Sequence, residues 1–267
     1  MLNETGAAKS GTIQTVERAL GVLEVFFEDA GSVSVTEVAA KTGLAPATTH
    51  RVLSTLVGMG WLEQDVRSSR YQLSEQLLGS AALALANSVL LREGQHFLSR
   101  ISDATGLNSF LAVRRNRSSV LLARAQGRRG SSSDFQVGKA IPMHASASGK
   151  LFLAFLPEAE RREIVSQVDL KANTSRTITD REQLEIELRT IREVGYAADR
   201  NELYESYKSI AVPVRLADRR IIAALCAGWW AAPGAESPDE NLEEAVLREM
   251  LPAAEEFSRI YGQFANW

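Results

Sequence analysis

The sequence predicts an α+β protein made of an N-terminal winged helix-turn-helix, a linker helix and a C-terminal α/β domain with an antiparallel sheet. Two observations support this prediction. Between Ser34 and Leu73, two short helical patterns meet at Thr42-Gly43, and a compact strand-turn-strand pattern follows directly. After Asn108, strand patterns joined by short turns are mixed with helical ones. The first order of elements is typical of a winged helix-turn-helix, which places one helix in a DNA major groove and a hairpin beside the backbone.

The composition is that of a globular protein of about two domains. The chain has 267 residues, of which 45% are hydrophobic and 24% are charged. A single cysteine, Cys226, excludes an internal disulfide and any cysteine-rich zinc site. No apolar run reaches the roughly 18 residues of a membrane span, and the start MLNETGAAKSGT lacks the apolar core of a signal peptide. We therefore expect a cytoplasmic protein that does not contact a membrane.

The charge balance does not by itself indicate nucleic-acid binding. The formal net charge is −3. Residues 1–73 carry six Lys and Arg against eight Asp and Glu, so this part of the chain is slightly acidic. If it binds DNA, its few arginines must gather on one face and dimerisation must multiply the contacts.

The predicted N-terminal module contains three helices. The first is Ile13–Phe27, with a shared apolar face of Val16, Leu20, Leu23 and Phe27. Ser34 and Glu37 have the spacing of a capping box and begin the second helix, which buries Val35, Val38 and Ala39 and ends at Gly43. Ala45-Pro46 begins the third helix, because proline is tolerated in a first turn. Its predicted buried side chains are Thr49, Val52, Leu53 and Leu56.

A hairpin and a long apolar helix follow. Strands at Trp61–Glu63 and Tyr71–Leu73 flank a turn rich in Arg and Ser, which we interpret as the wing. The helix Ser74–Leu91 is apolar on too many sides for an isolated surface helix. It fits either a core helix or a linker that packs against a second protomer. We favour the linker, because the small N-terminal module has little chain to cover it. A further helix is predicted at Arg92–Ala104.

The C-terminal part is predicted to alternate between strands and helices. A second capping box, Thr179 with Glu182, opens a helix that Gly195 closes. The expected strands are Ser109–Arg114, Ser119–Ala125, Phe135–Ala140, Tyr196–Asn201, Ser209–Leu216 and Arg220–Trp229, and the expected helices are Ala147–Phe155, Pro157–Val165, Asp180–Val194 and Asp239–Tyr261. The predicted organisation is thus a mobile tail at 1–12, a winged helix-turn-helix at 13–74, a linker and dimerisation helix at 75–92 and an effector domain at 93–267.

Five ordered blocks resemble the IclR family of bacterial transcription regulators: TVERALGVLEVF, GLAPATTHRVLSTLVGMGWLEQ, PMHASASGKLFLAFLP, TSRTITDREQLEIELRTIREVGYAADRNE and SIAVPVRLADRRIIAALCAG. The third block is the most specific, and the resemblance covers nearly the whole chain. It implies a winged DNA-binding module, a linker helix and a GAF-like domain that binds a small organic effector. Family members commonly act as homodimers or homotetramers on palindromic operators in double-stranded DNA, and they often control the degradation of aromatic or other small organic acids.

The third helix and the wing supply the expected DNA contacts. His50 can donate or accept a hydrogen bond at a base edge, Thr48 can also touch a thymine methyl, and Arg51 suits a phosphate or a guanine. The full set of predicted DNA-binding residues is Ala47, Thr48, His50, Arg51, Ser54, Arg67 and Arg70. Where family members usually have Ser or Lys, this chain has Pro46 and Ala47, so fewer hydrogen bonds to bases are expected. The alternative for Arg67 and Arg70 is that they are ordinary surface arginines.

The resemblance also places the effector pocket among Ala147, Ser148, Asp199, Glu205, Ser209, Cys226 and Gly228. This chain departs from the family pattern at three of them: Ser209 is often Cys, and Cys226 and Gly228 are often Ser. The loss of two hydroxyls, with Trp229-Trp230 next to them, favours an aromatic or larger apolar effector; alternatively, the two tryptophans only cap the sheet. Backbone amides at the helix start Ser146–Gly149 suit a carboxylate.

We expect a regulator, more specifically a repressor, and not an enzyme. Cys226 lies in the apolar strand IIAALCAG, where a buried and inert thiol is usual. His50, His96 and His144 have no metal-ligand spacing, and the chain has no phosphate-binding glycine loop. No cofactor is therefore expected. The alternative function is a GAF-type small-molecule sensor or enzyme whose N-terminal module mediates protein contacts.

Overall fold

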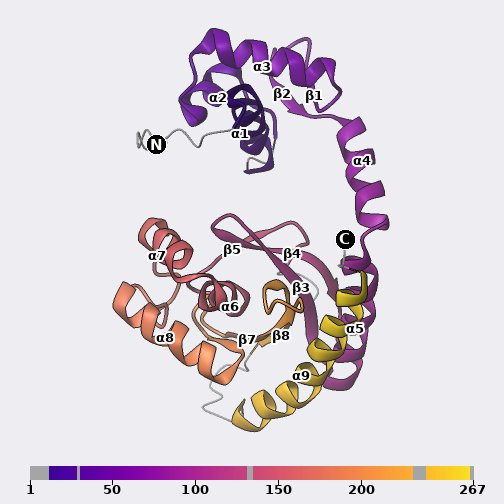
Figure 1. Ribbon diagram of the computed structural model, residues 1–267, viewed down its shortest axis with the longest axis vertical. Helices are drawn as coiled ribbons and strands as arrows, with labels where there is room; N and C mark the ends of the chain where they lie inside the picture. The colour runs from indigo at the N-terminus through magenta and orange to yellow at the C-terminus, as the bar shows by residue number, and fades with distance from the viewer. Residues whose placement is uncertain (1–11, 29–30, 131–134, 231–238, 265–267) are drawn as a thin grey trace. The chain divides into compact units, whose positions relative to one another are not determined.

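The computed structural model describes residues 12–28, 31–130, 135–230 and 239–264. Apart from Thr12, the predicted tail at residues 1–12 lies outside them. The chain divides into two compact units, Met1–Asn87 and Ser88–Trp267, and most of their elements are labelled in Figure 1.

The first unit contains a helix-turn-helix followed by a two-stranded wing. Its elements are α1 (Gln14–Glu28), α2 (Val35–Thr42), α3 (Pro46–Gly58), β1 (Leu62–Gln64), β2 (Tyr71–Leu73) and α4 (Glu75–Ala86). Both halves of the predicted capping box are present: the Glu37 amide donates to Ser34 Oγ, and the Ser34 amide donates to the Glu37 carboxylate. Gly43 ends α2 in the left-handed conformation, with φ of 70°, which glycine adopts without steric cost. The predicted winged module is therefore confirmed.

The core of this unit corrects the prediction for α1. Val22 and Phe26 are buried in the cluster formed with Val38, Leu53 and Tyr71. Of the predicted face, only Leu23 is buried, whereas Val16, Leu20 and Phe27 are exposed by 50%, 58% and 46%. The helix carries two apolar stripes, and the sequence period alone does not tell which one faces the module. Val35 and Val52, also predicted as buried, are only partly buried.

The linker helix is shorter than predicted. α4 ends at Ala86 with Asn87 as its cap, and Ser88 begins α5 (Val89–Thr105), with Ser88 Oγ accepting a hydrogen bond from the Leu91 amide. The continuous apolar run hid this break, because Asn87-Ser88 is a short polar interruption that ends one helix and caps the next. No residue of α4 is buried within the described chain.

The second unit is a six-stranded antiparallel sheet with helices on both faces. The strand order is β5-β4-β3-β8-β7-β6. The strands are β3 (Asn108–Arg115), β4 (Ser118–Ala125), β5 (Ala140–Pro142), β6 (Ala197–Arg200), β7 (Tyr207–Arg215) and β8 (Ile221–Trp230). The remaining helices are α6 (Ala147–Phe155), α7 (Glu158–Gln167), α8 (Arg181–Val194) and α9 (Asp239–Phe264). The predicted α+β class with an antiparallel sheet is confirmed.

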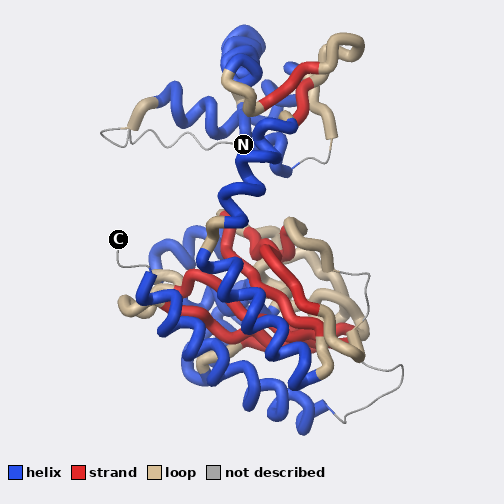
Figure 2. The backbone as a smooth tube through the Cα atoms, turned by 90° about the vertical axis from the view of Figure 1, so that its right-hand side faces the viewer, coloured by secondary structure: helices blue, strands red, loops and turns tan. Residues whose placement is uncertain are grey.

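Alternation along the central strands separates two cores. In β8, Leu225 belongs to the cluster with α5 and α9, whereas Cys226 belongs to the cluster with α6 and α8. α5 and α9 lie side by side on the face of the sheet to which Leu225 points (Figure 1; Figure 2). Successive side chains of a strand point to opposite faces. The place of a residue along β7 or β8 therefore decides whether its side chain faces α6.

Two local predictions in this unit are wrong by a few residues. The strand expected at Phe135–Ala140 is found at Ala140–Pro142, because Gly138 takes a left-handed φ of 87° and turns the chain before the strand begins. The helix α8 is capped by Asp180, whose carboxylate accepts from the Gln183 amide at 2.9 Å, and not by Thr179. Asp180 has the same capping chemistry one residue later.

Candidate DNA-binding surface and effector cavity

The third helix exposes the side chains that were predicted to read DNA. Ala47, His50, Arg51 and Ser54 are exposed, and Thr48 is half-buried. A groove between α1 and α3 is lined by Thr48, His50, Arg51 and Ser54, and also by Arg18 of α1. Arg18 was not predicted, since its helix was judged by its apolar face only. It adds a second positive charge to the groove beside Arg51.

The wing turn is held by Asp65. Its Oδ1 accepts hydrogen bonds from the backbone amides of Arg67 at 3.0 Å and Ser68 at 2.6 Å. These bonds, led by the one from Ser68, lower the pKa of the Asp65 carboxyl. Among the described residues, the Arg67 guanidinium has no ion pair or hydrogen bond, so it remains available for a phosphate.

Arg70 has a structural role instead. Its Nη2 donates to the carbonyl oxygen of Ser32 and to Glu37 Oε2, both at 2.8 Å. Hydrogen bonds from Ser34, and then Arg70, lower the pKa of the Glu37 carboxyl to about 2. Arg70 thus ties the base of the wing to the start of α2, and the two wing arginines, which were predicted to act alike, differ in their contacts.

A small, partly open cavity lies between the sheet and the start of α6. We call it the effector cavity; it is lined by Phe110, Leu121, Phe135, Ile141, Ser146, Ala147, Ser148, Leu203, Tyr207, Ser209 and Cys226. Four of the seven predicted effector residues lie here, namely Ala147, Ser148, Ser209 and Cys226. The free volume for a water-sized molecule is about 20 Å³. The cavity therefore combines small polar groups on one side with apolar and aromatic side chains on the other.

Serine side chains organise the polar side of this cavity. Ser146 caps α6: its Oγ accepts from the Gly149 amide at 3.1 Å and donates to the Pro142 carbonyl oxygen at 2.7 Å. The hydroxyls of Ser148 and Ser119 are hydrogen-bonded at 2.7 Å. Gly149 allows the preceding loop to approach, since an added Cβ would lie 2.3 Å from Met143 Cα. The first residues of α6, Ser146 to Ser148, thereby line the cavity from a fixed position.

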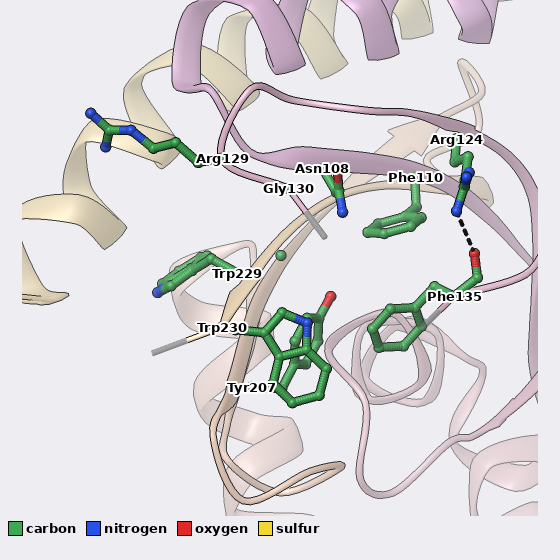
Figure 3. A pocket seen from close by; sticks show the side chains of 10 residues that line it. Asn108, Phe110, Arg124, Arg129, Gly130, Phe135, Tyr207, Trp229 and Trp230 are labelled. Carbon is green, nitrogen blue, oxygen red and sulfur yellow. Dashed lines mark hydrogen bonds between the residues drawn. The ribbon is translucent and has the colours of Figure 1, made fainter. Parts of the chain in front are cut away.

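An aromatic cluster closes the opposite side. It consists of Phe110, Phe135, Tyr204, Tyr207 and Trp230, with ring centroids 4.7 Å apart for Phe135 and Tyr207 and 5.2 Å apart for Tyr207 and Trp230. Figure 3 shows most of these rings around an adjoining small hollow. Trp229 points to the other core of the sheet. Only Trp230 therefore packs in this aromatic cluster, because neighbours on a strand face opposite ways; both tryptophans border the adjoining hollow, and neither lines the effector cavity.

Gly228 lies in the adjoining hollow and not in the effector cavity. A Cβ at this position would lie 1.8 Å from the hydroxyl oxygen of Tyr207. Tyr207 is buried and was not predicted. The Tyr207 ring therefore occupies the space that a side chain at position 228 would need, so that glycine is required there.

The two predicted carboxylates do not line the cavity. Asp199 pairs with Ser209 across β6 and β7. It is fully buried, and its Oδ1 accepts from the amides of Glu202 at 2.7 Å and Leu203 at 3.3 Å. Burial raises its pKa to about 7, against the effect of these bonds. Glu205 is exposed, and it accepts from the Ser175 amide at 3.4 Å. Asp199 thus shapes the loop that carries Leu203, and Glu205 lies outside the cavity.

A buried ion-pair network next to Asp199 was missed by the sequence analysis. Lys150 of α6 is fully buried, and its Nζ lies 2.5 Å from Glu202 Oε1 and 3.1 Å from Glu187 Oε1. Lysine is almost never buried without a partner. Patterns of apolar residues in the sequence therefore do not reveal a buried lysine. The network fixes α6, and hence Ser146 and Ser148, relative to α8 and the loop after β6.

The described residues offer no catalytic centre of the kinds considered from the sequence. Burial raises the pKa of the Cys226 thiol to about 12, so it is not a thiolate. His144 is buried and bonded through Nε2 to the Lys171 carbonyl oxygen at 3.0 Å. The described chain has no group of three potential metal ligands and no helix long and apolar enough to cross a membrane.

Comparison with known proteins agrees with this architecture. The chain matches the family model of the bacterial transcriptional regulator IclR C-terminal domain over residues 82–251 and that of the IclR helix-turn-helix domain over residues 15–66. It is 31% identical to the HTH-type transcriptional regulator XynR of Escherichia coli (strain K12), over 80% of this chain and 84% of that protein.

Solved structures show the same likeness. An IclR family transcriptional regulator from Brucella abortus has a TM-score of 0.77 at 25% identity, over 94% of each chain. An IclR homolog from Microbacterium hydrocarbonoxydans, complexed with 4-hydroxybenzoate, has a TM-score of 0.66 at 26% identity, over 91% of this chain and 98% of that one. With its DNA-binding helix-turn-helix and its effector domain, this chain belongs to the IclR family of bacterial transcriptional regulators.

Proposed function

We propose that the chain is a cytoplasmic repressor that binds a palindromic operator as a homodimer or homotetramer and releases or tightens it in response to an aromatic acid. The observation that supports this most directly is the two-sided effector cavity, with serine hydroxyls and a helix start on one side and aromatic rings on the other. A dimer that covers a promoter-proximal palindrome excludes the transcription machinery by occupying its site.

The chemistry of the cavity favours an aromatic carboxylate over a small hydroxy- or oxo-acid. The start of α6 suits the carboxylate, and Phe110, Phe135 and Tyr207 suit an aromatic ring. Burial raises the pKa of Asp199 to about 7, so Asp199 becomes increasingly neutral as the pH falls below that value and then repels an anion less. The complex of a family homolog with 4-hydroxybenzoate is consistent with this class of ligand.

The size of the cavity links binding to a change of conformation. A free volume of about 20 Å³ holds roughly one water molecule and no benzene ring. An aromatic acid therefore enters only if side chains such as Phe135 or Tyr207 move. A ligand shifts a protein between states by its difference in affinity for them, and such coupling is typically about 5–150-fold in the affinity of the other ligand.

Calorimetry with a panel of aromatic acids tests the cavity assignment. We expect native protein to bind at least one of them and Ser148→Trp to lose it, because an indole at this position fills the cavity. Ser166→Trp, on the exposed face of α7, is the matched control and should bind like the native protein. The acid that binds should also change the affinity for operator DNA, measured by fluorescence anisotropy.

Three results would contradict the proposal. Equal binding of the acids by native protein and Ser148→Trp would place the ligand elsewhere. Binding without any change in operator affinity would remove the regulatory role. A fall in target transcript on deletion of the gene would make the protein an activator.

A further inference from the structure

A second and larger hollow lies at the far end of α6 from the effector cavity. It has a volume of about 590 Å³ and is formed where the end of α6 meets α7 and the hairpin between β7 and β8. Its floor is apolar and includes Phe152, Phe155 and Ile221. Its rim carries four arginines against two carboxylates: Arg114, Arg215, Arg219 and Arg220 against Glu160 and Asp218. We call it the arginine hollow.

Two of these arginines form an ion pair with a carboxylate and two do not. Arg114 Nη2 lies 2.8 Å from Glu160 Oε1, and Arg220 Nε lies 3.5 Å from Asp218 Oδ2. Within the described part of the chain, neither Arg215 nor Arg219 has an ion pair. The hollow therefore carries an excess of positive charge that no protein group compensates.

Arg215 is placed for stacking as well as for charge. Its Cζ lies 4.2 Å from the centroid of the Phe155 ring, within the range of a cation–π contact. Burial, and next the charge of Arg219, lowers the pKa of Arg215. Both arginines line the same hollow, and an anion bound between them relieves the repulsion of their charges.

The hairpin turn holds Arg219 at the rim. Arg219 has a left-handed φ of 66°, and its amide donates to the Leu216 carbonyl oxygen at 2.9 Å. Asp218 Oδ1 accepts from the Arg220 amide at 3.0 Å, which fixes the same turn. Glycine is the residue this conformation favours. An arginine in its place extends a long cationic side chain from a rigid position.

We propose that the arginine hollow is a second ligand site, for a small anion of the aryl phosphate or aryl carboxylate class. Arg215 and Arg219 hold the anionic group, for which guanidinium is the matching fork. The flat ring lies on the floor formed by Phe155 and Ile221. This site is separate from the effector cavity and does not depend on the function proposed for it.

Binding of phenyl phosphate, measured by calorimetry on the full chain, tests the proposal. We expect the double variant Arg215→Gln/Arg219→Gln to bind at least about tenfold more weakly, since each lost charged hydrogen bond is worth that much or more. Arg248→Gln removes one charge from an exposed pair on α9 and is the control; it should bind within about twofold of native protein. Inorganic phosphate alone should bind more weakly than phenyl phosphate, because it gains nothing from the apolar floor.

The effector-cavity variant separates the two sites. Ser148→Trp should bind phenyl phosphate as the native protein does; loss of binding in that variant would show that the probe occupies the effector cavity and would overturn the assignment. Unchanged binding by Arg215→Gln/Arg219→Gln would also overturn it, as would native protein that binds no phenyl phosphate at millimolar concentration. Equal affinity for phosphate and phenyl phosphate would reduce the hollow to a simple anion site and refute the aryl class.

Discussion

Among single residues, Asp199 has the contacts that depend most on pH. It is fully buried, its Oδ1 receives two backbone amides, and its Oδ2 has no partner among the described residues. Lys150 lies close enough to lower its pKa and Glu202 close enough to raise it, but burial is the largest effect and brings the pKa to about 7. The residue therefore changes charge inside the physiological range, next to the loop that carries Leu203 into the effector cavity.

The raised pKa predicts how stability changes with pH. Between the unfolded value of 3.8 and the folded value of about 7, the folded state binds more protons than the unfolded state. The free energy of unfolding therefore falls as pH rises through this window, by up to about 1.4 kcal/mol per pH unit, and this contribution is constant above it. Asp199→Asn, which keeps the amide-accepting oxygen, should lack this dependence.

Calorimetric melting between pH 4.5 and 8 measures the difference. The native protein should lose melting temperature relative to Asp199→Asn as pH rises to about 7, the folded pKa of Asp199. Asp103→Asn, which alters an exposed carboxyl on α5, should follow the native protein throughout. Parallel curves for native protein and Asp199→Asn would mean that Asp199 remains ionised in the fold.

Among the elements, the wing depends on one arginine for its attachment and leaves another exposed. Arg70 binds Ser32 and Glu37, whereas Arg67 projects from the turn that Asp65 holds. The sequence places both within the same basic turn, and nothing in their spacing separates an anchor from a DNA contact.

Substitution of each arginine should therefore give a different result. Arg67→Ala should weaken binding to all DNA sequences about equally and reduce the dependence of binding on salt, because a phosphate contact releases counterions. It should leave the melting temperature unchanged. Arg70→Ala should lower the melting temperature of the winged module. The prediction is wrong if Arg67→Ala destabilises the module as much as Arg70→Ala does, or if its effect is confined to one operator sequence.

The elements that the sequence predicted well are those whose signals are local. The capping box at Ser34 and Glu37 and the left-handed Gly43 are read directly from residue type and spacing. Two errors came from apolar patterns: α1 has two apolar stripes, and the break at Asn87 lies inside an apolar run. The resemblance pointed to Ser148 and Ser209, which line the cavity, whereas Tyr207 enters it through the sheet register and Lys150 is placed beside it by burial. Their role in binding an effector stays a prediction.

For the whole molecule, the exposed apolar face of α4 bears on the assembly that we propose. The helix is rich in Ala and Leu, yet Leu78, Leu83 and Leu85 are exposed by 59%, 67% and 51% in the single chain. Leu78 and Leu85 are seven residues apart and share one face. Such a face is stable in water when a second copy covers it, which is the assembly proposed for operator binding.

Polar substitution of this face should dissociate the protein and weaken DNA binding together. We expect Leu78→Gln/Leu85→Gln to shift native dimers or tetramers toward monomers in light scattering. Its operator affinity should fall steeply, because two half-sites are no longer read by one particle. Ser80→Gln, on the opposite face of α4, should change neither. A native protein that is monomeric at micromolar concentration, or a double variant that remains assembled, would refute this.

The contact between Tyr207 and position 228 restricts how this regulator and its relatives diverge. With a Cβ placed 1.8 Å from the tyrosine hydroxyl oxygen, no residue other than glycine fits at 228 while that ring keeps its position. A relative with serine at 228 must therefore have a shorter or differently oriented side chain at 207. The two positions should consequently covary among family sequences.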